Sequence, residues 1–366
     1  MLIDEFSSFE NKYLFEKKYD DFSYWVYSRY AIFSYLTKLQ EGIEMSSQKM
    51  TDGLICGIKN MIINSLRYRH KIKKIGHRDL LILNHERRVL KDGYYRCIYT
   101  EQIEEHYPNS VVLERPYFYK HLKPIQTERI FYSDCVELES LIYGFLECKL
   151  KAKKYRKAKK FFEKEMSIVA PEFQHMVKQE VSVEALSEML TRLYLLYCVK
   201  RKKFEKIIQK IQPKVILEVV SYNLDCMIFN EIAYEKKINT IELQHGVMSG
   251  SIAYYYPKNV LIKQFPQKVF LFSDYWKNCI SVPLEDKNVI SVGYPYFEEQ
   301  VKKYQKINCD KNKTTKVILF LSQWTIGENF SKFAVEFNNL INGKWKIIYK
   351  LHPGEYANWK KRYPWL

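Results

Sequence analysis

The stretch KVILEVV at residues 214–220 begins a series of short apolar segments that decides the fold. NTIEL (239–243), KVFLF (268–272) and NVISV (288–292) follow it, and a helical pattern over about 223–237 separates the first two segments. Strands that alternate with helices are typical of a parallel sheet covered by helices. The sequence therefore predicts an α/β fold over this part of the chain.

Strand candidates also precede this series. LLIL (80–83), VVLE (111–114) and IFYS (130–133) are short runs of mainly apolar and aromatic residues, and the Asp-Gly pair at 92–93 predicts a hairpin turn. Together with the later segments, these runs predict one Rossmann-like domain at residues 76–301.

Two other regions carry apolar side chains at three- and four-residue spacing, which indicates helices. The first gives a helical N-terminal region at residues 1–75, and the second a helical insertion at about 136–210.

A polar, lysine-rich segment at 302–315 is a predicted linker to a second Rossmann-like domain, of which residues 316–366 would be the start. That part repeats the pattern of strand, helix and strand, with KVILFL at 316–321 and KIIYKL at 346–351. Two parallel strands are too few for a domain. Either they extend the first sheet, or the chain is a truncated form whose C-terminal domain is mostly missing, and we expect truncation.

The composition excludes several classes of protein. Hydrophobic residues make up 47% of the 366 residues, with only 12 Gly and 11 Pro, which excludes disordered and collagen-like chains. No run approaches 18 uncharged apolar residues, and the N-terminus lacks the apolar core of a signal peptide. Eight scattered cysteines without a CxxC pair indicate reduced thiols and no metal site. We therefore expect a cytoplasmic protein.

The net charge is +17, and it is concentrated in KLKAKKYRKAKK at residues 149–160. One interpretation is a solvated helix whose apolar stripe faces the core. A second is a helix that lies against anionic lipid at the inner face of the cytoplasmic membrane. Aromatic residues are not interleaved with this run, so we expect no nucleic acid partner.

Ligands of open α/β sheets bind at the carboxyl ends of the strands. His85, which follows the strand at 80–83, and its neighbours Arg87 and Arg88 form a basic tip. This tip predicts either an anionic acceptor or solvent-facing charge.

The strand at 239–243 is followed by Gln244, His245 and Gly246. A histidine titrates near neutral pH, so His245 is a candidate general base for a sugar hydroxyl. The alternative is a core histidine bonded to a backbone carbonyl. Asp274, after the strand at 268–272, is a candidate catalytic carboxylate or a helix N-cap.

The strand at 346–351 ends in Lys350, His352, Pro353 and Gly354. An imidazole and an ammonium at one strand end suit a phosphate oxygen, and the glycine permits close backbone approach. The alternative is a histidine that caps a tight turn. Ser322, Gln323 and Thr325 follow the strand at 316–321, where hydroxyls and the next helix N-terminus favour phosphate.

IELQHGVMSG (241–250), FSDYW (272–276), VGYP (292–295) and KLHPGE (350–355) together resemble bacterial GT-B transferases of surface polysaccharide synthesis. These include capsule and lipopolysaccharide glycosyltransferases, sialyl- and Kdo-transferase-like enzymes and CDP-glycerol glycerophosphotransferases. The resemblance implies two Rossmann-like domains, with the nucleotide-sugar donor on the C-terminal domain and the acceptor on the N-terminal one. It also implies that His352 and Pro353 contact the donor phosphate, and that Gln244, His245 and Gly246 face the acceptor.

The resulting expectation is a metal-independent glycosyltransferase without a cofactor. It would move a sugar from a CMP-, CDP- or UDP-linked donor to a capsule or O-antigen polysaccharide or to a polyprenyl-phosphate-linked acceptor. One alternative is a transferase of glycerol or ribitol phosphate that uses a CDP-linked donor. Another is a non-catalytic basic binding protein or a truncated remnant.

Overall fold

The computed structural model describes residues 2–10, 12–41, 51–85, 88–116, 120–257, 260–305, 316–323, 326–356 and 358–366. The chain forms two compact units, Met1–Glu298 and Glu299–Leu366. Helix α10 (Pro295–Gln305) spans the boundary between them.

The first unit is built on a seven-stranded sheet in the order β5-β4-β1-β6-β7-β8-β9, in which every neighbouring pair is parallel. The strands are β1 (Leu80–Leu83), β4 (Ser110–Glu114), β5 (Ile130–Tyr132), β6 (Val215–Val219), β7 (Asn239–Leu243), β8 (Lys268–Leu271) and β9 (Val289–Ser291). All seven coincide with the segments predicted from the sequence, and the predicted α/β fold is confirmed.

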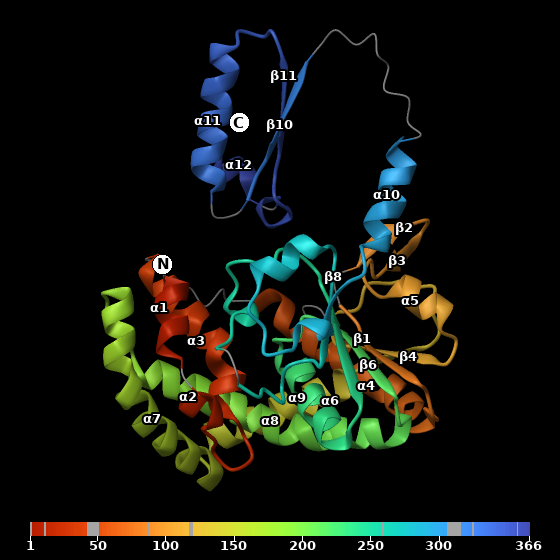
Figure 1. The fold of residues 1–366 in the computed structure, drawn as a ribbon, viewed down its shortest axis with the longest axis vertical. Helices are drawn as coiled ribbons and strands as arrows, with labels where there is room; N and C mark the ends of the chain where they lie inside the picture. The colour runs from red at the N-terminus through yellow and green to blue at the C-terminus, as the bar shows by residue number, and fades with distance from the viewer. Residues whose placement is uncertain are drawn as a thin grey trace. The chain divides into compact units, whose positions relative to one another are not determined.

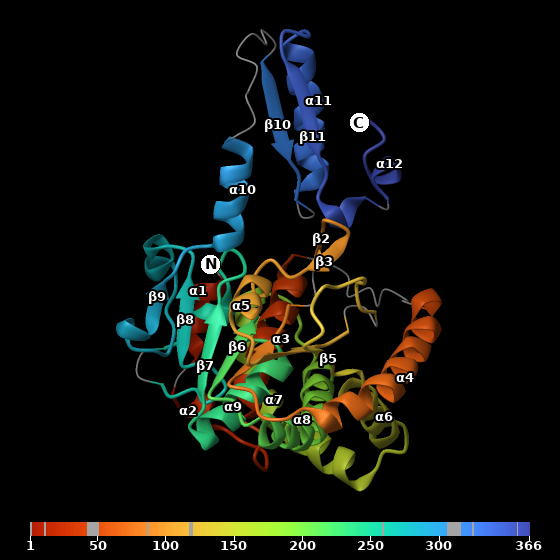
Figure 2. The same cartoon turned by 90° about the vertical axis from the view of Figure 1, so that its right-hand side faces the viewer.

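The direction in which the sheet grows reverses between β1 and β6. Strands β4 and β5 extend it on one side of β1, whereas β6 to β9 extend it on the other. The strands are parallel, so their carboxyl ends lie along one edge, toward which β6, β7 and β8 point in Figure 2. Such a reversal is the topological switch point at which open α/β sheets bind ligands.

A layer of long helices covers one face of this sheet (Figure 1). It consists of α6 (Asp134–Lys149), α7 (Lys153–Val177), α8 (Val183–Ile211) and α9 (Leu224–Lys236), and α8 packs against the other three. Helix α9 begins at the switch point, where the Asn223 side chain accepts a hydrogen bond from the Cys226 N–H at 2.9 Å. This N-cap satisfies a donor that the first turn leaves open.

The N-terminal region is helical, as predicted, with α1 (Leu2–Phe9), α2 (Lys12–Glu16), α3 (Tyr24–Gln40) and α4 (Thr51–Lys74). Arg29 of α3, whose side chain is 2% exposed, pairs with Glu10 and donates to the backbone carbonyls of Ile252 (2.6 Å) and Tyr255 (2.7 Å). A buried charge is stable only when it is paired with an opposite charge and its donors are hydrogen-bonded. Arg29 therefore ties the N-terminal helices to the 252–255 segment between β7 and β8.

The opposite face of the sheet is covered by α5 (Glu101–His106) near β4. A hairpin of β2 (Val89–Lys91) and β3 (Tyr94–Arg96) precedes α5, and its turn residues Asp92 and Gly93 have φ of 51° and 81°. Both values suit the Asp-Gly pair that predicted the turn. Three short 3-10 helices lie in the connections between the last strands. They are η1 (Ile252–Tyr254) between β7 and β8, and η2 (Asp274–Cys279) and η3 (Asp286–Asn288) between β8 and β9.

The second unit has a two-stranded parallel sheet of its own, with β10 (Val317–Leu321) and β11 (Lys346–Lys350). Helix α11 (Gly327–Leu340) packs on one face through Phe330, Phe333 and Phe337, whose rings meet Phe320. The 3-10 turn η4 (Pro353–Glu355) and helix α12 (Trp359–Arg362) follow. The alternative in which these strands extend the first sheet is therefore wrong for the described residues.

In the described part of the chain, no helix is both long and apolar enough to cross a bilayer. The six cysteines described there are free thiols, as expected. The apolar stripe of α7, which includes Ala158, Phe162 and Met166, is buried in the core.

Candidate functional site

Two of the histidines singled out in the sequence lie together at the switch point. His85 follows β1 and His245 follows β7, and their ring centroids are 6.2 Å apart. Tyr222, which follows β6, lies between these strands in the sheet order, and its ring is 6.1 Å from His245. Strands from distant parts of the chain thus place three titratable side chains at one edge.

Tyr99, which precedes α5, completes this group. Its hydroxyl donates to the backbone carbonyl of His245 at 2.8 Å, and its ring lies 5.7 Å from His85. His85, Tyr99, Tyr222 and His245 are all partly exposed. These four residues are called the switch-point cluster below.

The backbone beside the cluster is strained at Val220, which has a φ of +68°. A β-branched residue in this left-handed region is a genuine outlier and costs on the order of 1–3 kcal/mol. Asn223 restrains it, because its side-chain amide donates to the Val220 carbonyl at 2.7 Å. Strain of this kind persists where surrounding contacts enforce it and concentrates at functional sites.

Two buried glutamates lie beneath the strand ends. Glu218 of β6 and Glu242 of β7 are register neighbours, and both are fully buried. Burial, reinforced by the charge of Glu242, raises the pKa of Glu218 to about 8. Burial also raises the pKa of Glu242. Neither side chain reaches the surface, so their role toward a ligand is to position other groups.

Glu242 performs this positioning through two hydrogen bonds. Its carboxylate accepts the Ser221 backbone N–H at 3.0 Å and the Tyr254 hydroxyl at 2.7 Å. The ring of Tyr254 in turn meets that of Tyr222 edge to face, with centroids 5.9 Å apart. Glu242 thus supports both the strained backbone and one ring of the cluster.

The phenol of Tyr222 is a hydrogen-bond donor in this site. Burial, followed by the nearby Tyr30, raises its pKa above the ordinary value, so the hydroxyl keeps its proton at neutral pH. Its oxygen lies 3.5 Å from His245 Nε2, at the long end of hydrogen bonding. A neutral His245 that accepts at Nε2 is chemically able to take a proton from a bound hydroxyl.

A largely apolar groove of about 710 Å³ runs from the cluster along the sheet face opposite the long helices. Tyr99, Phe272 and Tyr294 line its end at the carboxyl edge. The Tyr294 ring stacks on Phe272 at 4.3 Å and on Tyr99 at 5.9 Å. Flat aromatic surfaces of this kind suit contact with a sugar or a base.

Gln244, Gly246 and Asp274 are the other residues that the sequence predicted for this site. Gln244 is buried, and its side chain donates to the Gly246 carbonyl at 2.8 Å and accepts the Phe272 N–H at 2.7 Å. It therefore fastens the end of β7 to that of β8, whereas Gly246 is partly exposed. Asp274 is well exposed and pairs with Lys277 and Ser291, and these partners lower its pKa. Such a carboxylate is a poor base.

The basic tip expected at residues 85–88 is only partly present. Arg88 has a side chain that is 2% exposed and pairs with Glu114 at 2.7 Å, so it stabilises the interior and does not meet an acceptor. Arg87 lies outside the described residues. Of the two described members of the tip, His85 has the predicted place at the strand end.

In the second unit, the buried carboxylate of Glu355 occupies the N-terminal end of α11. It accepts hydrogen bonds from Ser322 (3.1 Å), Tyr363 (2.5 Å) and the His352 N–H (2.6 Å). A Cβ at Gly327, the first residue of α11, would lie 2.1 Å from this carboxylate. The helix N-terminus and Ser322 are thus already occupied by an internal anion, which argues against the predicted phosphate role of Ser322.

The phosphate role of His352 stays a prediction. Its Nδ1 accepts a hydrogen bond from the Gly354 N–H at 3.1 Å, so the neutral ring carries its proton on Nε2. Lys350 and Gln323 are exposed, and Pro353 begins η4. Thr325 lies outside the described residues.

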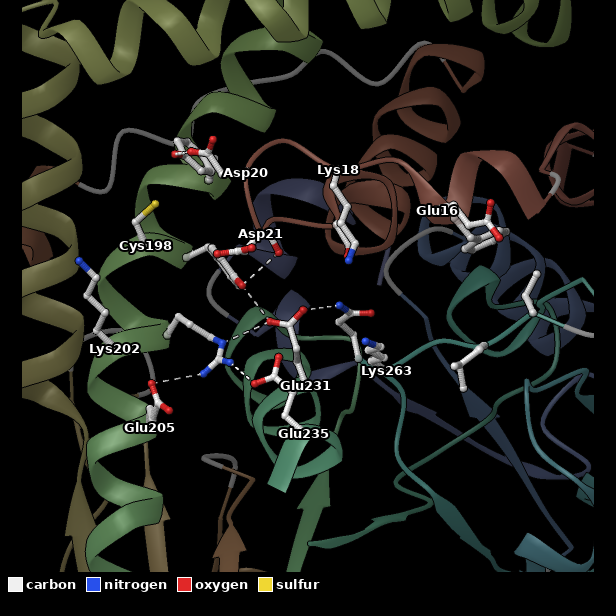
Figure 3. Close-up of a pocket in the computed structure, with 18 of the residues that line it drawn as sticks. Glu16, Lys18, Asp20, Asp21, Cys198, Lys202, Glu205, Glu231, Glu235 and Lys263 are labelled. Atoms are coloured by element: carbon white, nitrogen blue, oxygen red, sulfur yellow. Dashed lines mark hydrogen bonds and ion pairs between the residues drawn. The ribbon is translucent and has the colours of Figure 1, made fainter. Parts of the chain in front are cut away.

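A second cavity of the first unit, of about 1000 Å³, lies between α2, α8, α9 and the 260–264 segment (Figure 3). Its central Arg201 pairs with Glu235 at 2.5 Å and with Glu231 at 3.4 Å. Glu231 also accepts from Tyr197 at 2.9 Å and Gln264 at 2.6 Å. Arg201, Glu231 and Glu235 thus pair with one another in the wall of this cavity.

Sequence reasoning missed Tyr99, Tyr222 and Glu355. Tyr222 lies two residues beyond a predicted strand, which was the available signal for it. Tyr99 and Glu355 acquire their roles from partners that only the fold brings close. In the described ranges, no group of three or more potential metal ligands comes together.

The fold and site define a class, a doubly wound parallel α/β protein with a cluster of histidines and tyrosines at its switch point. No protein-family model and no curated protein matches the sequence. Among solved structures, UDP-GlcNAc 2-epimerase from Neisseria meningitidis bound to UDP-GlcNAc is similar with a TM-score of 0.35 and 11% identity, over 78% of this chain and 69% of that chain. A likeness this distant carries no information about the site.

Proposed function

We propose that the chain is a nucleotide-sugar-dependent transferase and that the switch-point cluster binds its hydroxyl acceptor. The observation that carries the proposal is the convergence of His85, Tyr99, Tyr222 and His245 at the reversal of the sheet, next to the strained Val220. The acceptor would be a capsule or O-antigen polysaccharide or a polyprenyl-phosphate-linked sugar.

His245 is the proposed general base. Its Nε2 removes the proton of the acceptor hydroxyl while the hydroxyl oxygen forms a bond to the sugar carbon that leaves the nucleotide. The bond from that carbon to the nucleotide phosphate breaks, and the phosphate keeps the electron pair. The 3.5 Å contact with Tyr222 is long enough for a closer substrate hydroxyl to replace it.

The donor phosphate is proposed to bind His352 and Lys350 in the second unit. The Nε2–H of His352 is a hydrogen-bond donor, and the exposed Lys350 ammonium adds a positive charge. Both groups stabilise the negative charge that develops on the departing nucleotide. The Ser322 hydroxyl is not available to the phosphate, because it already donates a hydrogen bond to Glu355.

The two halves of the proposal are tested separately. Titration of the purified chain with CMP, CDP, UDP and GDP and their sugar conjugates identifies the donor through the rise in melting temperature that binding causes. His352→Ala should weaken donor binding about tenfold or more, whereas His245→Ala should leave binding intact and lower transfer by about a hundredfold or more. His175→Ala, an exposed histidine of α7, serves as the matched control.

A screen without any nucleotide-dependent shift would contradict the donor assignment. Transfer that persists in His245→Ala would contradict the assignment of the base. Activity with CDP-glycerol or CDP-ribitol in place of a sugar donor would instead identify a polyol-phosphate transferase.

A further inference from the structure

The outward faces of α4 and α6 are apolar, although both helices lie at the surface. The side chains concerned are 40–72% exposed: Ile58, Ile62, Ile63 and Leu66 on α4, and Leu141, Ile142, Phe145 and Leu146 on α6, with Leu150 directly after it. A surface helix ordinarily turns polar residues outward. Contiguous exposed apolar residues of this kind mark an interaction surface.

The two helices present these residues side by side. Helix α4 packs against α6, and both views show them adjacent (Figures 1 and 2). Met61 is buried on the inner face of α4, as are Val136 and Ser140 on that of α6, so the exposed residues lie opposite the core. The exposed residues of the two helices are called the α4–α6 face below.

Exposed basic residues lie on the same helices and next to them along the chain, and they are called the basic rim below. Lys59 and Arg67 are exposed on α4, and Lys149, Lys151 and Lys153 are exposed where α6 leads into α7. The Lys149 ammonium lies 5.5 Å from the Phe145 ring centroid, so its stem runs along the apolar surface. Arg156, Lys157, Lys160 and Lys164 continue a basic stripe along the exposed side of α7.

Acidic side chains balance little of this charge. Glu139 is an exposed carboxylate of α6, and it already pairs with Lys203. An apolar centre with a rim of cations matches a bilayer whose headgroups are anionic. A two-fold dimer through this face would bring two basic rims together, which is unfavourable.

We propose that the α4–α6 face docks on an anionic membrane surface, with Phe145, Leu146 and Leu66 inserted among the lipids and the rim of lysines and arginines on the headgroups. This assigns lipid contact to α4 and α6. The apolar stripe of α7 is buried, so α7 adds only its charges. The proposal does not depend on the reaction that the chain catalyses.

Flotation with lipid vesicles tests the proposal on the full chain. The chain should bind vesicles of equal amounts of phosphatidylcholine and phosphatidylglycerol, should lose binding as salt is raised, and should bind phosphatidylcholine vesicles far less. Phe145→Glu/Leu146→Glu should abolish binding. Leu90→Glu, at a residue equally exposed in the hairpin, is the matched control and should bind as the wild type does.

A second variant keeps the test sharp if the first one folds poorly. The triple variant Lys153→Ala/Arg156→Ala/Lys157→Ala removes three basic residues at the start of α7. The loss of each charge should lower the affinity for the anionic vesicles about fivefold. Absence of binding to anionic vesicles, or binding unchanged in both variants, would overturn the proposal. A wild-type dimer that Phe145→Glu/Leu146→Glu converts to a monomer, without vesicle binding, would overturn it in favour of a second copy.

Discussion

Glu218 and Glu242 are register neighbours on β6 and β7, and both carboxyl groups are completely buried. Two such groups on adjacent strands cannot both be charged without a large cost. Glu218 accepts the Asn230 side-chain amide at 2.8 Å, and Glu242 accepts the Ser221 N–H at 3.0 Å. The hydrogen bonds beneath the switch-point cluster are thus made by two carboxyl groups whose protonation state affects the stability of the fold.

The pKa of Glu218 predicts a pH dependence of stability. Its value rises from 4.5 to about 8 in the folded chain. Between these values the unfolded chain has released the proton and the native chain still holds it, so stability falls as pH rises. The slope is on the order of 1 kcal/mol per pH unit.

Glu218→Gln tests this dependence, because the amide cannot ionise and still accepts from Asn230. We expect the variant to gain stability relative to the wild type as pH rises toward about 8, and the difference to level off above that value. Urea unfolding of both proteins across this range measures it. A difference that is constant with pH would show that Glu218 titrates normally.

Arg88 provides a second prediction, about stability and not about binding. Its guanidinium pairs with Glu114 at 2.7 Å and lies 3.7 Å from Glu101, and all three side chains are at least 94% buried. Arg88→Ala removes the nearest cation of both carboxylates and leaves Glu114 with His121 and Glu101 with Arg96, which should cost about 3–5 kcal/mol of unfolding free energy. Chemical denaturation measures the loss.

Arg192→Ala is the control, since Arg192 is exposed on α8 and pairs with Glu188 one helical turn away. We expect it to lose less than about 1 kcal/mol. Equal losses in the two arginine variants would contradict the structural role of Arg88. A loss of ligand binding without a loss of stability in Arg88→Ala would instead restore the acceptor role predicted from the sequence.

Gly327 gives a third prediction, in the second unit. An added Cβ would lie 2.1 Å from Glu355 Oε1 and 2.2 Å from the Tyr363 hydroxyl. Gly327→Ala should therefore displace the Glu355 carboxylate from the end of α11 and destabilise this unit by about 1–3 kcal/mol. Faster amide hydrogen exchange in β10, β11 and α11 would report it.

Gly76→Ala is the matched control, because nothing lies within 4 Å of a Cβ at that position. We expect it to exchange as the wild type does in the second unit. If the two glycine variants are alike there, the close packing around Glu355 is not what stabilises the unit.

The fold was accessible from the sequence because its signals are local. Each of the seven strands is a short apolar run, and Asp92-Gly93 marks its hairpin by the backbone conformations that these two residues tolerate. The placement of His85 and His245 at one edge also followed, since the carboxyl ends of parallel strands share that edge. A local sequence pattern is enough to predict that two residues lie at the same edge when only the direction of their strands decides it.

The roles of residues whose partners are distant in the sequence could not be predicted from the sequence. Arg88 looked like a solvent-facing charge because its partner Glu114 lies on another strand. Ser322 looked like a phosphate ligand because Glu355, to which its hydroxyl donates a hydrogen bond, is distant in the sequence. Gln244 looked accessible, yet its side-chain oxygen accepts a hydrogen bond from the Phe272 N–H, directly after β8.

The sequence by itself determined which segments become strands and helices, where each strand ends, and that basic residues gather at 149–160. Only the tertiary structure decided which strand ends meet, which charges are buried and that the exposed face of α4 and α6 is apolar. The physical reason is that backbone propensity and periodicity act over a few residues, whereas burial and hydrogen bonding depend on groups that the order of the sheet brings together.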